Sequence, residues 1–285
     1  MKTLLSLGLC VALFLPVAQA QTNPAAPAVA SRLTVAQVEE LVAPIALYPD
    51  PLIALILPAA TQPSEIVLAA RFLERGSPAD AATNEPWDDA VKALVRYPEV
   101  LEYLDENLEW TRSLGETFLD QRDLVMASIQ TLRARARENG LLSSSPEQEV
   151  IVEADEIRIV PAQPTVIYVP RYDPEVLYVS HLYTYWPRPF ITFGIGYSVG
   201  WWLTFDCDWR FRTVHIVHRP EYWYHRPDWR VRYHPHHRHP DWRWTRWMPR
   251  PHHHRHHVSS HRASERVLRP KRDWEAARRT RLAAQ

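Results

Sequence analysis

The sequence predicts a mainly α protein with a small β unit. In this α+β fold a helical body is followed by short antiparallel strands and by a low-complexity, largely disordered tail. Three observations support this fold class. Apolar residues recur at helical spacing over residues 34–142. Over residues 148–180 they alternate at a period of two, as in half-buried strands. Across residues 218–285 proline, histidine, arginine and tryptophan dominate, without a sustained apolar period.

Residues 1–20 have the three parts of a secretory signal peptide. Lys2 supplies a positive charge, Leu4–Leu15 is almost wholly apolar, and Ala18-Gln19-Ala20 is a small-x-small cleavage site. The apolar run is shorter than the roughly 20 residues that a membrane-spanning helix needs. We therefore expect an exported protein, periplasmic or associated with the cell envelope, with no transmembrane helix in the mature chain. Residues 21–33 are predicted to form a flexible leader.

Two helix starts open the body. Thr34 and Gln37 have the spacing of a capping box, which predicts a short helix directly after them. In "ALYPDPLIAL", Asp50 is expected to cap a second helix, because a carboxylate accepts hydrogen bonds from the first free N–H groups. Pro51 suits the first helical position, where its missing N–H costs nothing. Pro58 is expected to bend or end this helix.

Three further helices complete the body. Pro63 begins one of them and Gly76 closes it. Asp88 is predicted to cap the helix in "WDDAVKALVRYP", which Pro98 interrupts. The longest helix is expected from about Leu108 to Asn139, because one apolar stripe continues through it. The stripe consists of Thr111, Leu114, Phe118, Val125, Ile129, Leu132 and Ala136.

Four short segments predict the β unit at residues 148–180. They are rich in β-branched and aromatic residues, and proline or acidic turns separate them. In chain order they are "EVIVE", "EIRIV", "TVIYV" and "EVLYV". The prolines between them confine several of these strands to sheet edges.

Four longer blocks occur in a fixed order between Val38 and Tyr178: "ALYPDPLIAL", "WDDAVKALVRYPEVL", "LEWTRSLGETFLDQRDLVMASIQTLRARARENG" and "VIYVPRYDPEVLYV". Together they resemble the bacterial domain of unknown function 3300 family. The resemblance implies an exported bacterial envelope protein with a helical body and a variable tail. It implies no activity and no catalytic residues.

Phe190–Phe205, "FITFGIGYSVGWWLTF", is the most apolar stretch of the mature chain. We assign residues 181–217 to an apolar Gly/Trp hairpin region that is either buried or in contact with a membrane surface. Trp201 and Trp202 suit both environments, because tryptophan is favoured at lipid interfaces and equally in protein cores.

Gly196-Tyr197-Ser198-Val199-Gly200 matches the G-x-S-x-G motif of serine hydrolases. That motif requires a strand-turn-helix in a large parallel sheet, and the flanking sequence does not predict one. Asp206, Asp208 and several histidines follow Ser198, so a hydrolase remains a distant alternative. We expect no enzyme activity.

The charge divides the chain into two parts. Residues 21–180 contain 12 Lys and Arg against 25 Asp and Glu, and residues 181–285 contain 20 against 8. All 14 histidines and ten of the 12 tryptophans lie in the second part. Cleavage leaves Cys207 as the one cysteine, interpreted as a half-buried thiol without a role, with a free thiol or an intermolecular link as alternatives.

Histidines of the tail are candidate metal ligands, because neutral imidazoles bind divalent transition metals. They are His236, His237, His239, His252, His253, His254, His256 and His257. Their spacing defines no single geometry, so we expect no dedicated cofactor and only loose binding of nickel, copper or zinc.

Two other classes of contact compete with metal binding. Arginines interleaved with Trp and Tyr provide charge and flat faces for a polyanion, and the export signal favours an anionic envelope polymer or lipid surface over nucleic acid. Alternatively, the basic tail docks on the acidic body or on a protein partner. The sequence therefore predicts a non-enzymatic exported envelope protein with an interacting tail, and a periplasmic metal-binding or metal-buffering protein as the alternative.

Overall fold

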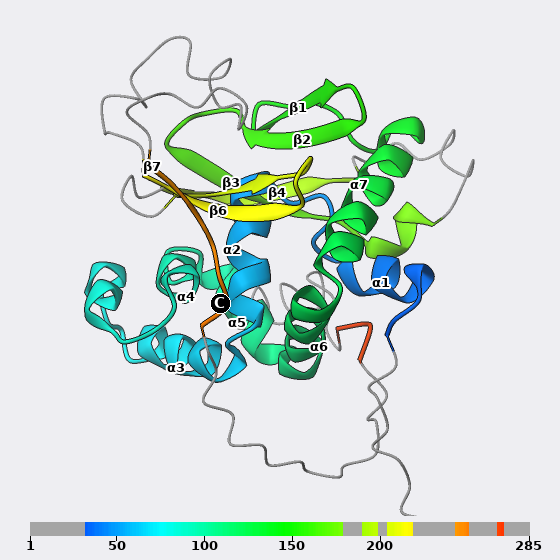
Figure 1. Ribbon diagram of the computed structural model, residues 1–285. Helices are drawn as coiled ribbons and strands as arrows, with labels where there is room; N and C mark the ends of the chain where they lie inside the picture. The colour runs from blue at the N-terminus through cyan, green and yellow to red at the C-terminus, as the bar shows by residue number, and fades with distance from the viewer. Residues whose placement is uncertain (1–31, 179–189, 199–203, 219–242, 251–266, 271–285) are drawn as a thin grey trace, which may run out of the picture. The chain divides into compact units, whose positions relative to one another are not determined.

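A computed structural model describes residues 32–178, 190–198, 204–218, 243–250 and 267–270. The helices are α1 Val35–Val42, α2 Asp50–Ala60, α3 Pro63–Glu74, α4 Asp89–Leu94, α5 Pro98–Glu106, α6 Leu108–Asp120 and α7 Arg122–Glu138, with 3-10 helices η1 Ala79–Asn84 and η2 Pro174–Leu177. The strands are β1 Gln148–Glu153, β2 Glu156–Pro161, β3 Val166–Arg171, β4 Thr192–Ser198, β5 Thr204–Asp208, β6 Thr213–His218 and β7 Arg243–Arg246. The predicted α+β fold class is confirmed (Figure 1).

The helix α2 is the centre of the core. Each of its residues is buried, and it packs on α4, α6 and β5 (Figure 1). Pro58 was expected to bend or end this helix. It does not end the helix, because it lies inside α2, which continues to Ala60. The chain then turns, and α3 leaves α2 at a bend of 113°. No single helix in the described residues is long and apolar enough to cross a membrane, although α2 and α3 together have that length and composition.

The predicted capping residues and the glycines that end helices act as the sequence predicts, apart from Asp50. Thr34 and Gln37 form both bonds of the capping box, and Asp88 accepts from the Ala90 N–H over 2.9 Å. Gly76 and Gly140, after α3 and α7, have φ of +73° and +71°, a backbone region in which glycine avoids the Cβ clash of other residues.

The expected long helix from Leu108 to Asn139 is wrong, because it is two helices. The chain leaves the helical conformation at Gln121, whose φ is −136°, between α6 and α7. The Gln121 side chain holds this break by accepting from the Leu33 N–H over 2.8 Å and donating to the Leu33 carbonyl over 2.9 Å. The predicted stripe is nevertheless buried at every position. Gly115 of α6 is required for close packing, since a Cβ there would lie 2.1 Å from the Ala60 carbonyl oxygen.

In the described residues, three small antiparallel sheets lie beside the helices: β1-β2, β3-β4 and β5-β6-β7. The first three predicted strands are confirmed, but "EVLYV" is wrong, because Asp173 caps the 3-10 helix η2 there through the Glu175 N–H. The described residues of Phe190–Phe205 do not pair with one another as a hairpin, although β5 and β6 form one over residues 204–218. The strand β4 of this stretch pairs with β3, and its strand β5 pairs with β6. The apolar stretch therefore joins two different sheets.

Candidate functional site

Asp50 lies at the centre of a group of buried charges. Its side chain is 0 % exposed, at the first residue of α2. Arg133 of α7 donates from Nη1 to Asp50 Oδ1 over 2.7 Å, and Arg158 of β2 donates from Nε to Oδ2 over 3.3 Å. Trp209 Nε1 donates to Oδ2 over 3.0 Å, and the Ile159 N–H donates to Oδ1 over 3.3 Å. Four donors thus compensate a carboxylate that water does not reach.

The predicted role of Asp50 as a helix cap is wrong. Pro49 occupies the N-cap position of α2, and no side chain caps this end. Asp50 stands in the first turn, where a negative charge still suits the helix dipole. Its oxygens are instead directed to side chains that are 83, 108 and 159 positions away in the sequence.

Arg133 uses its remaining donors on backbone carbonyls. Nε donates to Ala46 over 2.9 Å, Nη1 also donates to Ile157 over 2.8 Å, and Nη2 donates to Tyr48 over 2.8 Å. Its guanidinium lies over the Trp209 ring, with Cζ 4.6 Å from the ring centroid. One side chain therefore connects the segment before α2, the strand β2 and the residue after β5.

Asp206 balances the second arginine. Arg158 Nη2 lies 3.4 Å and 3.5 Å from the two carboxylate oxygens of Asp206, and both side chains are 1 % exposed. We call Asp50, Arg133, Arg158, Asp206 and Trp209 the Asp50 cluster. Two carboxylates and two guanidiniums give it no net charge, which is the condition under which buried ions are tolerated.

Cys207 is enclosed by this cluster. The thiol is free and 0 % exposed, with Sγ 3.7 Å from the Asp50 carbonyl oxygen. Burial, followed by the nearby carboxylates of Asp50 and Asp206, raises the pKa of Cys207 well above its ordinary value. The thiol is therefore more deeply buried than the half-buried side chain predicted, and a link to another chain would require this core to open.

The turn between β5 and β6 carries a rigid, exposed tip. Asp208 Oδ1 accepts from the Phe211 N–H over 3.0 Å, and the Trp209 carbonyl accepts from the Arg212 N–H over 3.3 Å. Arg212 has a φ of +50°, so the backbone is held in a tight, left-handed conformation. Arg210 and Arg212 are exposed, and Phe211 is 64 % exposed. We call these three residues the RFR turn.

The tail returns to the body through β7. This strand pairs with β6. The next residue, Trp247, donates its backbone N–H to the Val214 carbonyl over 2.9 Å. Trp247 is 4 % exposed, and its ring lies 5.8 Å from that of Phe118 in α6. Arg122 stacks on the same phenyl ring, and burial together with the Arg246 guanidinium lowers the pKa of Arg122. Residues 243–247 are thus part of the folded body.

Arg250 fastens the tail to the acidic body. Its Nη1 and Nη2 donate to the carbonyls of Pro86 and Trp87 over 3.1 Å and 2.7 Å. Its guanidinium also lies 3.6 Å from Glu65 and 3.7 Å from Asp88. Burial raises the pKa of Asp88, while the Ala90 N–H and the charge of Arg250 act in the opposite direction.

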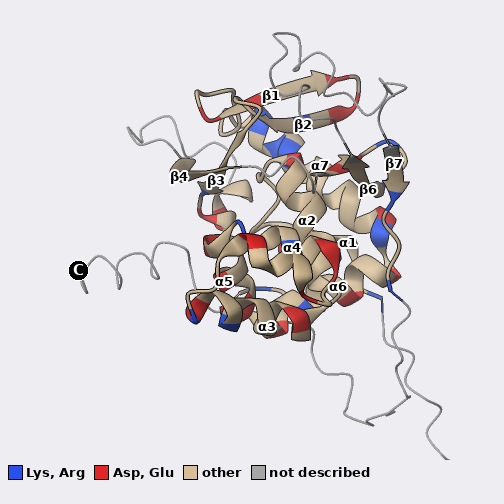
Figure 2. Ribbon diagram, turned by 90° about the vertical axis from the view of Figure 1, so that its left-hand side faces the viewer, with Lys and Arg blue, Asp and Glu red and all other residues tan. Residues whose placement is uncertain are grey.

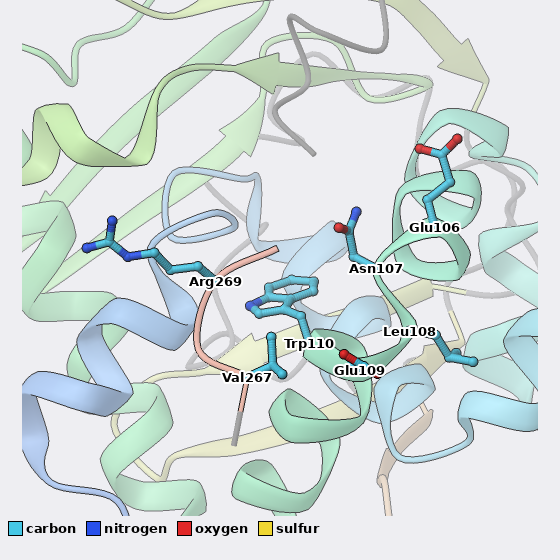
Figure 3. Close-up of a pocket in the computed structure, with 7 residues that line it drawn as sticks. All are labelled: Glu106, Asn107, Leu108, Glu109, Trp110, Val267 and Arg269. Atoms are coloured by element: carbon cyan, nitrogen blue, oxygen red, sulfur yellow. The ribbon is translucent and has the colours of Figure 1, made fainter. Parts of the chain in front are cut away.

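A second contact is made by Val267–Pro270, which we call the strap. Arg269 pairs with Glu40, and with Glu175 over 3.2 Å. Val267 and Arg269 also line a pocket of about 270 Å³ at the start of α6, whose other lining residues are Glu106, Asn107, Leu108, Glu109 and Trp110. Figure 3 shows Val267 beside the Trp110 ring, with the Arg269 side chain extending away from it. The segments on both sides of the strap lie outside the described residues, so no ligand is assigned to this pocket.

These contacts bear on the expected character of the tail. Of residues 218–285, the structure describes His218, 243–250 and 267–270, and among these Trp247, Val267 and Leu268 pack on the core of the body. Figure 2 shows the acidic residues spread over α3, α5 and α6. Arg250 and Arg269 meet four carboxylates of the body, so one of the three predicted contact classes, docking of the basic tail on the acidic body, does occur at these two arginines.

All eight candidate metal ligands, from His236 to His257, lie outside the described residues. Among the residues that are described, no group of three or more His, Cys, Asp or Glu side chains has the arrangement of a metal site. Metal binding by these histidines stays a prediction. Calorimetric titration with copper and zinc, with all eight replaced by glutamine in a second chain, measures whether any saturable site depends on them.

The described part of the serine motif, Gly196 to Ser198, lies in a strand. Gly196, Tyr197 and Ser198 belong to β4 of the two-stranded sheet with β3, whereas Val199 and Gly200 lie outside the described residues. Gly196 has a packing reason, since a Cβ there would lie 2.4 Å from Val166 Cγ1. Close contact between strands thus explains a glycine that also fits the hydrolase pattern.

The comparisons with known proteins agree with the resemblance seen in the sequence. The chain belongs to the family described as Protein of unknown function (DUF3300), whose model matches residues 34–267. It is similar to the uncharacterized protein YacH of Escherichia coli (strain K12), with 34 % identity over 228 residues. The matched region covers 62 % of this chain and 37 % of that relative. No solved structure matches the chain.

Proposed function

We propose that this family member is a non-enzymatic, exported cell-envelope protein that presents a basic, aromatic surface to anionic envelope components. One observation carries the proposal. Five arginines after residue 190 have described, exposed side chains. Arg250 and Arg269 pair with carboxylates of the same chain, whereas Arg210, Arg212 and Arg246 form no ion pair with a described carboxylate. Exposed guanidiniums beside aromatic rings are suited to phosphate, carboxylate and sulfate groups.

The burial of the Asp50 cluster supports a non-enzymatic role. This cluster brings two carboxylates and two guanidiniums into direct contact, yet each of these side chains is 1 % exposed or less. A substrate would have to open the core to reach them. The cluster therefore acts on the fold, and it positions the RFR turn through the buried Trp209.

Binding to model polyanions tests the proposal. The mature chain, purified without an added histidine tag, is incubated with anionic polysaccharide beads and with vesicles of anionic or neutral lipid. We expect retention on the anionic supports that weakens as ionic strength rises, because salt screens exposed charges beyond about 8–10 Å. Equal retention on anionic and neutral supports, or none on either, contradicts the proposal.

Export is tested separately. The signal pattern predicts that the mature protein begins at Gln21 and is released by osmotic shock or recovered with the envelope. Mass spectrometry of the protein from fractionated cells gives both its N-terminus and its compartment. Recovery of the uncleaved chain from the cytoplasm contradicts the proposed location.

A further inference from the structure

We propose that the RFR turn, Arg210-Phe211-Arg212, is the site at which the protein contacts an anionic lipid surface, with the phenyl ring entering the acyl boundary and the guanidiniums at the phosphates. This inference rests on the proposed function and specifies its partner. Phe211 is 64 % exposed at the tip of a two-strand turn, between two exposed arginines. Amphipathic contacts of this kind, an apolar group flanked by cations, are typical of lipid interfaces.

The exposure of Phe211 is built into the fold. Trp209, two residues before it, is 4 % exposed, and its indole is bonded to Asp50. Asp208 fixes the backbone of the tip through the Phe211 N–H, and the buried Thr213 follows the turn. Because both flanks are anchored in the core, the ring is held outward before any partner arrives. Preorganisation of this kind lowers the entropic cost of binding.

The shape of the turn favours a lipid surface over the other anionic partners. Sugar rings and nucleobases are bound by flat stacking platforms or grooves, whereas Phe211 is a single exposed ring in a turn, with the Arg210 Cζ 5.7 Å from its centroid. Protein interfaces place their aromatic anchors in well-packed surroundings that exclude water. A bilayer needs no matching shape, and its surface supplies both the apolar layer and the phosphate charge.

The expected size of the effect follows from the parts of the turn. Each arginine near an anionic leaflet strengthens binding roughly fivefold, so Arg210→Gln together with Arg212→Gln should weaken it about 25-fold. Phe211→Ala removes the phenyl ring that would be buried in the acyl boundary of the bilayer, and it should weaken binding about tenfold. These contributions are small individually, so the turn is expected to work together with the rest of the basic surface.

The experiment measures co-sedimentation of the mature chain with vesicles of phosphatidylglycerol and phosphatidylcholine, and with vesicles of phosphatidylcholine alone. The variants are Phe211→Ala and the Arg210→Gln, Arg212→Gln pair. Leu68→Ala and the Arg75→Gln, Arg137→Gln pair are matched controls, since these side chains are exposed elsewhere on the body and the control pair also removes two charges. Thermal unfolding shows that each variant is folded. Loss of binding in the two turn variants, and not in the controls, supports the inference.

A fluorescent label gives an independent readout of insertion. Phe211→Cys is labelled with an environment-sensitive dye, because the buried Cys207 is shielded from the reagent. A blue shift with anionic vesicles is expected, and none for the same dye at Leu68→Cys. Anionic vesicle binding that is unchanged in the turn variants overturns this inference and leaves the proposed function intact. Binding to anionic polysaccharide beads but not to vesicles also overturns this inference and leaves the proposed function intact. Binding to neither overturns both the inference and the proposed function.

Discussion

Arginine and carboxylate meet in two regions of this molecule, and burial makes the two very different. In the Asp50 cluster, Arg133 and Asp50 are both 0 % exposed. At the tail contact, the Arg250 side chain is 45 % exposed beside Glu65 and Asp88. Water and salt compensate an exposed charge that loses its partner, but they do not reach a buried one. The cluster is therefore expected to hold the fold together, and the tail contacts to be readily released.

The cluster also joins parts of the chain that are distant in sequence. Asp50 comes from α2, Arg133 from α7 and Arg158 from β2, while Asp206 and Trp209 lie within residues 181–217, which the sequence does not predict as part of the body. The matched family region extends to residue 267, which agrees with a fold that needs this region. The contacts of Arg250 and Arg269, in contrast, are added to a body whose core is formed without them.

The largest expected effect is that of truncation. A chain ending at Ser180 loses Phe205 and Trp209 from the core, and removal of a large buried aromatic side chain typically costs about 3–5 kcal/mol. Since a whole domain is stable by about 5–15 kcal/mol, we expect this chain to lose its cooperative unfolding transition in circular dichroism.

A chain ending at Arg250 is the matched control. It keeps β5, β6, β7 and Trp247, so we expect a cooperative transition close to that of the full chain. A stable, cooperative fold in the chain ending at Ser180 would show that the Asp50 cluster is not required. Tests of tail ligands therefore need the longer chain.

Asp50→Ala should have the next largest effect. It leaves Arg133 and Arg158 buried without their carboxylate, and breaking a buried ion pair in this way costs about 3–5 kcal/mol. The comparison is Asp80→Ala, which removes an 83 % exposed partner of Arg96 and should cost less than about 1 kcal/mol. Urea unfolding measures both. Equal costs for the two substitutions would remove the distinction between buried and exposed pairs.

Trp209→Phe tests one hydrogen bond of the cluster. The substitution keeps an aromatic ring but removes the Nε1 donor to Asp50, and a hydrogen bond to a charged group contributes about 1.5–3 kcal/mol. Trp247→Phe is its control, because Trp247 Nε1 is buried without a hydrogen-bond partner among the described residues. Urea unfolding should show a smaller loss for Trp247→Phe, and the reverse order would contradict the assignment.

Alkaline pH should act on the same buried region. Burial raises the pKa of both Cys207 and Tyr172. A group whose folded pKa is raised stabilises the fold fully below its unfolded pKa, and this contribution is lost as pH rises further. We therefore expect the free energy of unfolding to fall above about pH 8.5, where an unfolded cysteine ionises, and to fall further above about pH 10 for tyrosine.

Thiol labelling tests the burial of Cys207, which is the cause of the first of these effects. Cys207 should react with a disulfide reagent in urea and not in the native protein at neutral pH, because the thiol is 0 % exposed. Native labelling as fast as that of the unfolded chain would show that the core around Asp50 is open.

The parts of the fold that local sequence determines could be predicted. The capping box at Thr34, the cap at Asp88 and the buried stripe of α6 and α7 depend on residues a few positions apart, and all three are confirmed. The break at Gln121 could not be predicted, because its side chain is held by Leu33, 88 residues earlier. The wrong strand at "EVLYV" has a different cause, because the Asp173 cap and Pro174 are local signals for a 3-10 helix that the strand composition outweighed in the prediction.

The Asp50 cluster was missed for the same reason. Asp50 has a good local explanation as a helix cap, and only the folded chain shows its partners. Signals were nevertheless present. Asp206 directly follows the most apolar stretch, and Arg158 lies between the two isoleucines of "EIRIV", although it keeps the alternation of that strand. Charged residues inside apolar segments are rarely left unpaired, so such residues can be matched by sign before the structure is known.

The smallest expected effect is release of the tail. Arg250→Gln removes the charge beside Glu65 and Asp88 but leaves β7 paired with β6, so the unfolding free energy should fall by less than about 1 kcal/mol. The effect should shrink further in high salt, whereas that of Asp50→Ala should not, because a buried pair is not screened. Urea unfolding of both variants at low and high ionic strength measures this. A cost for Arg250→Gln that is large and independent of salt would mean that the tail contact belongs to the core.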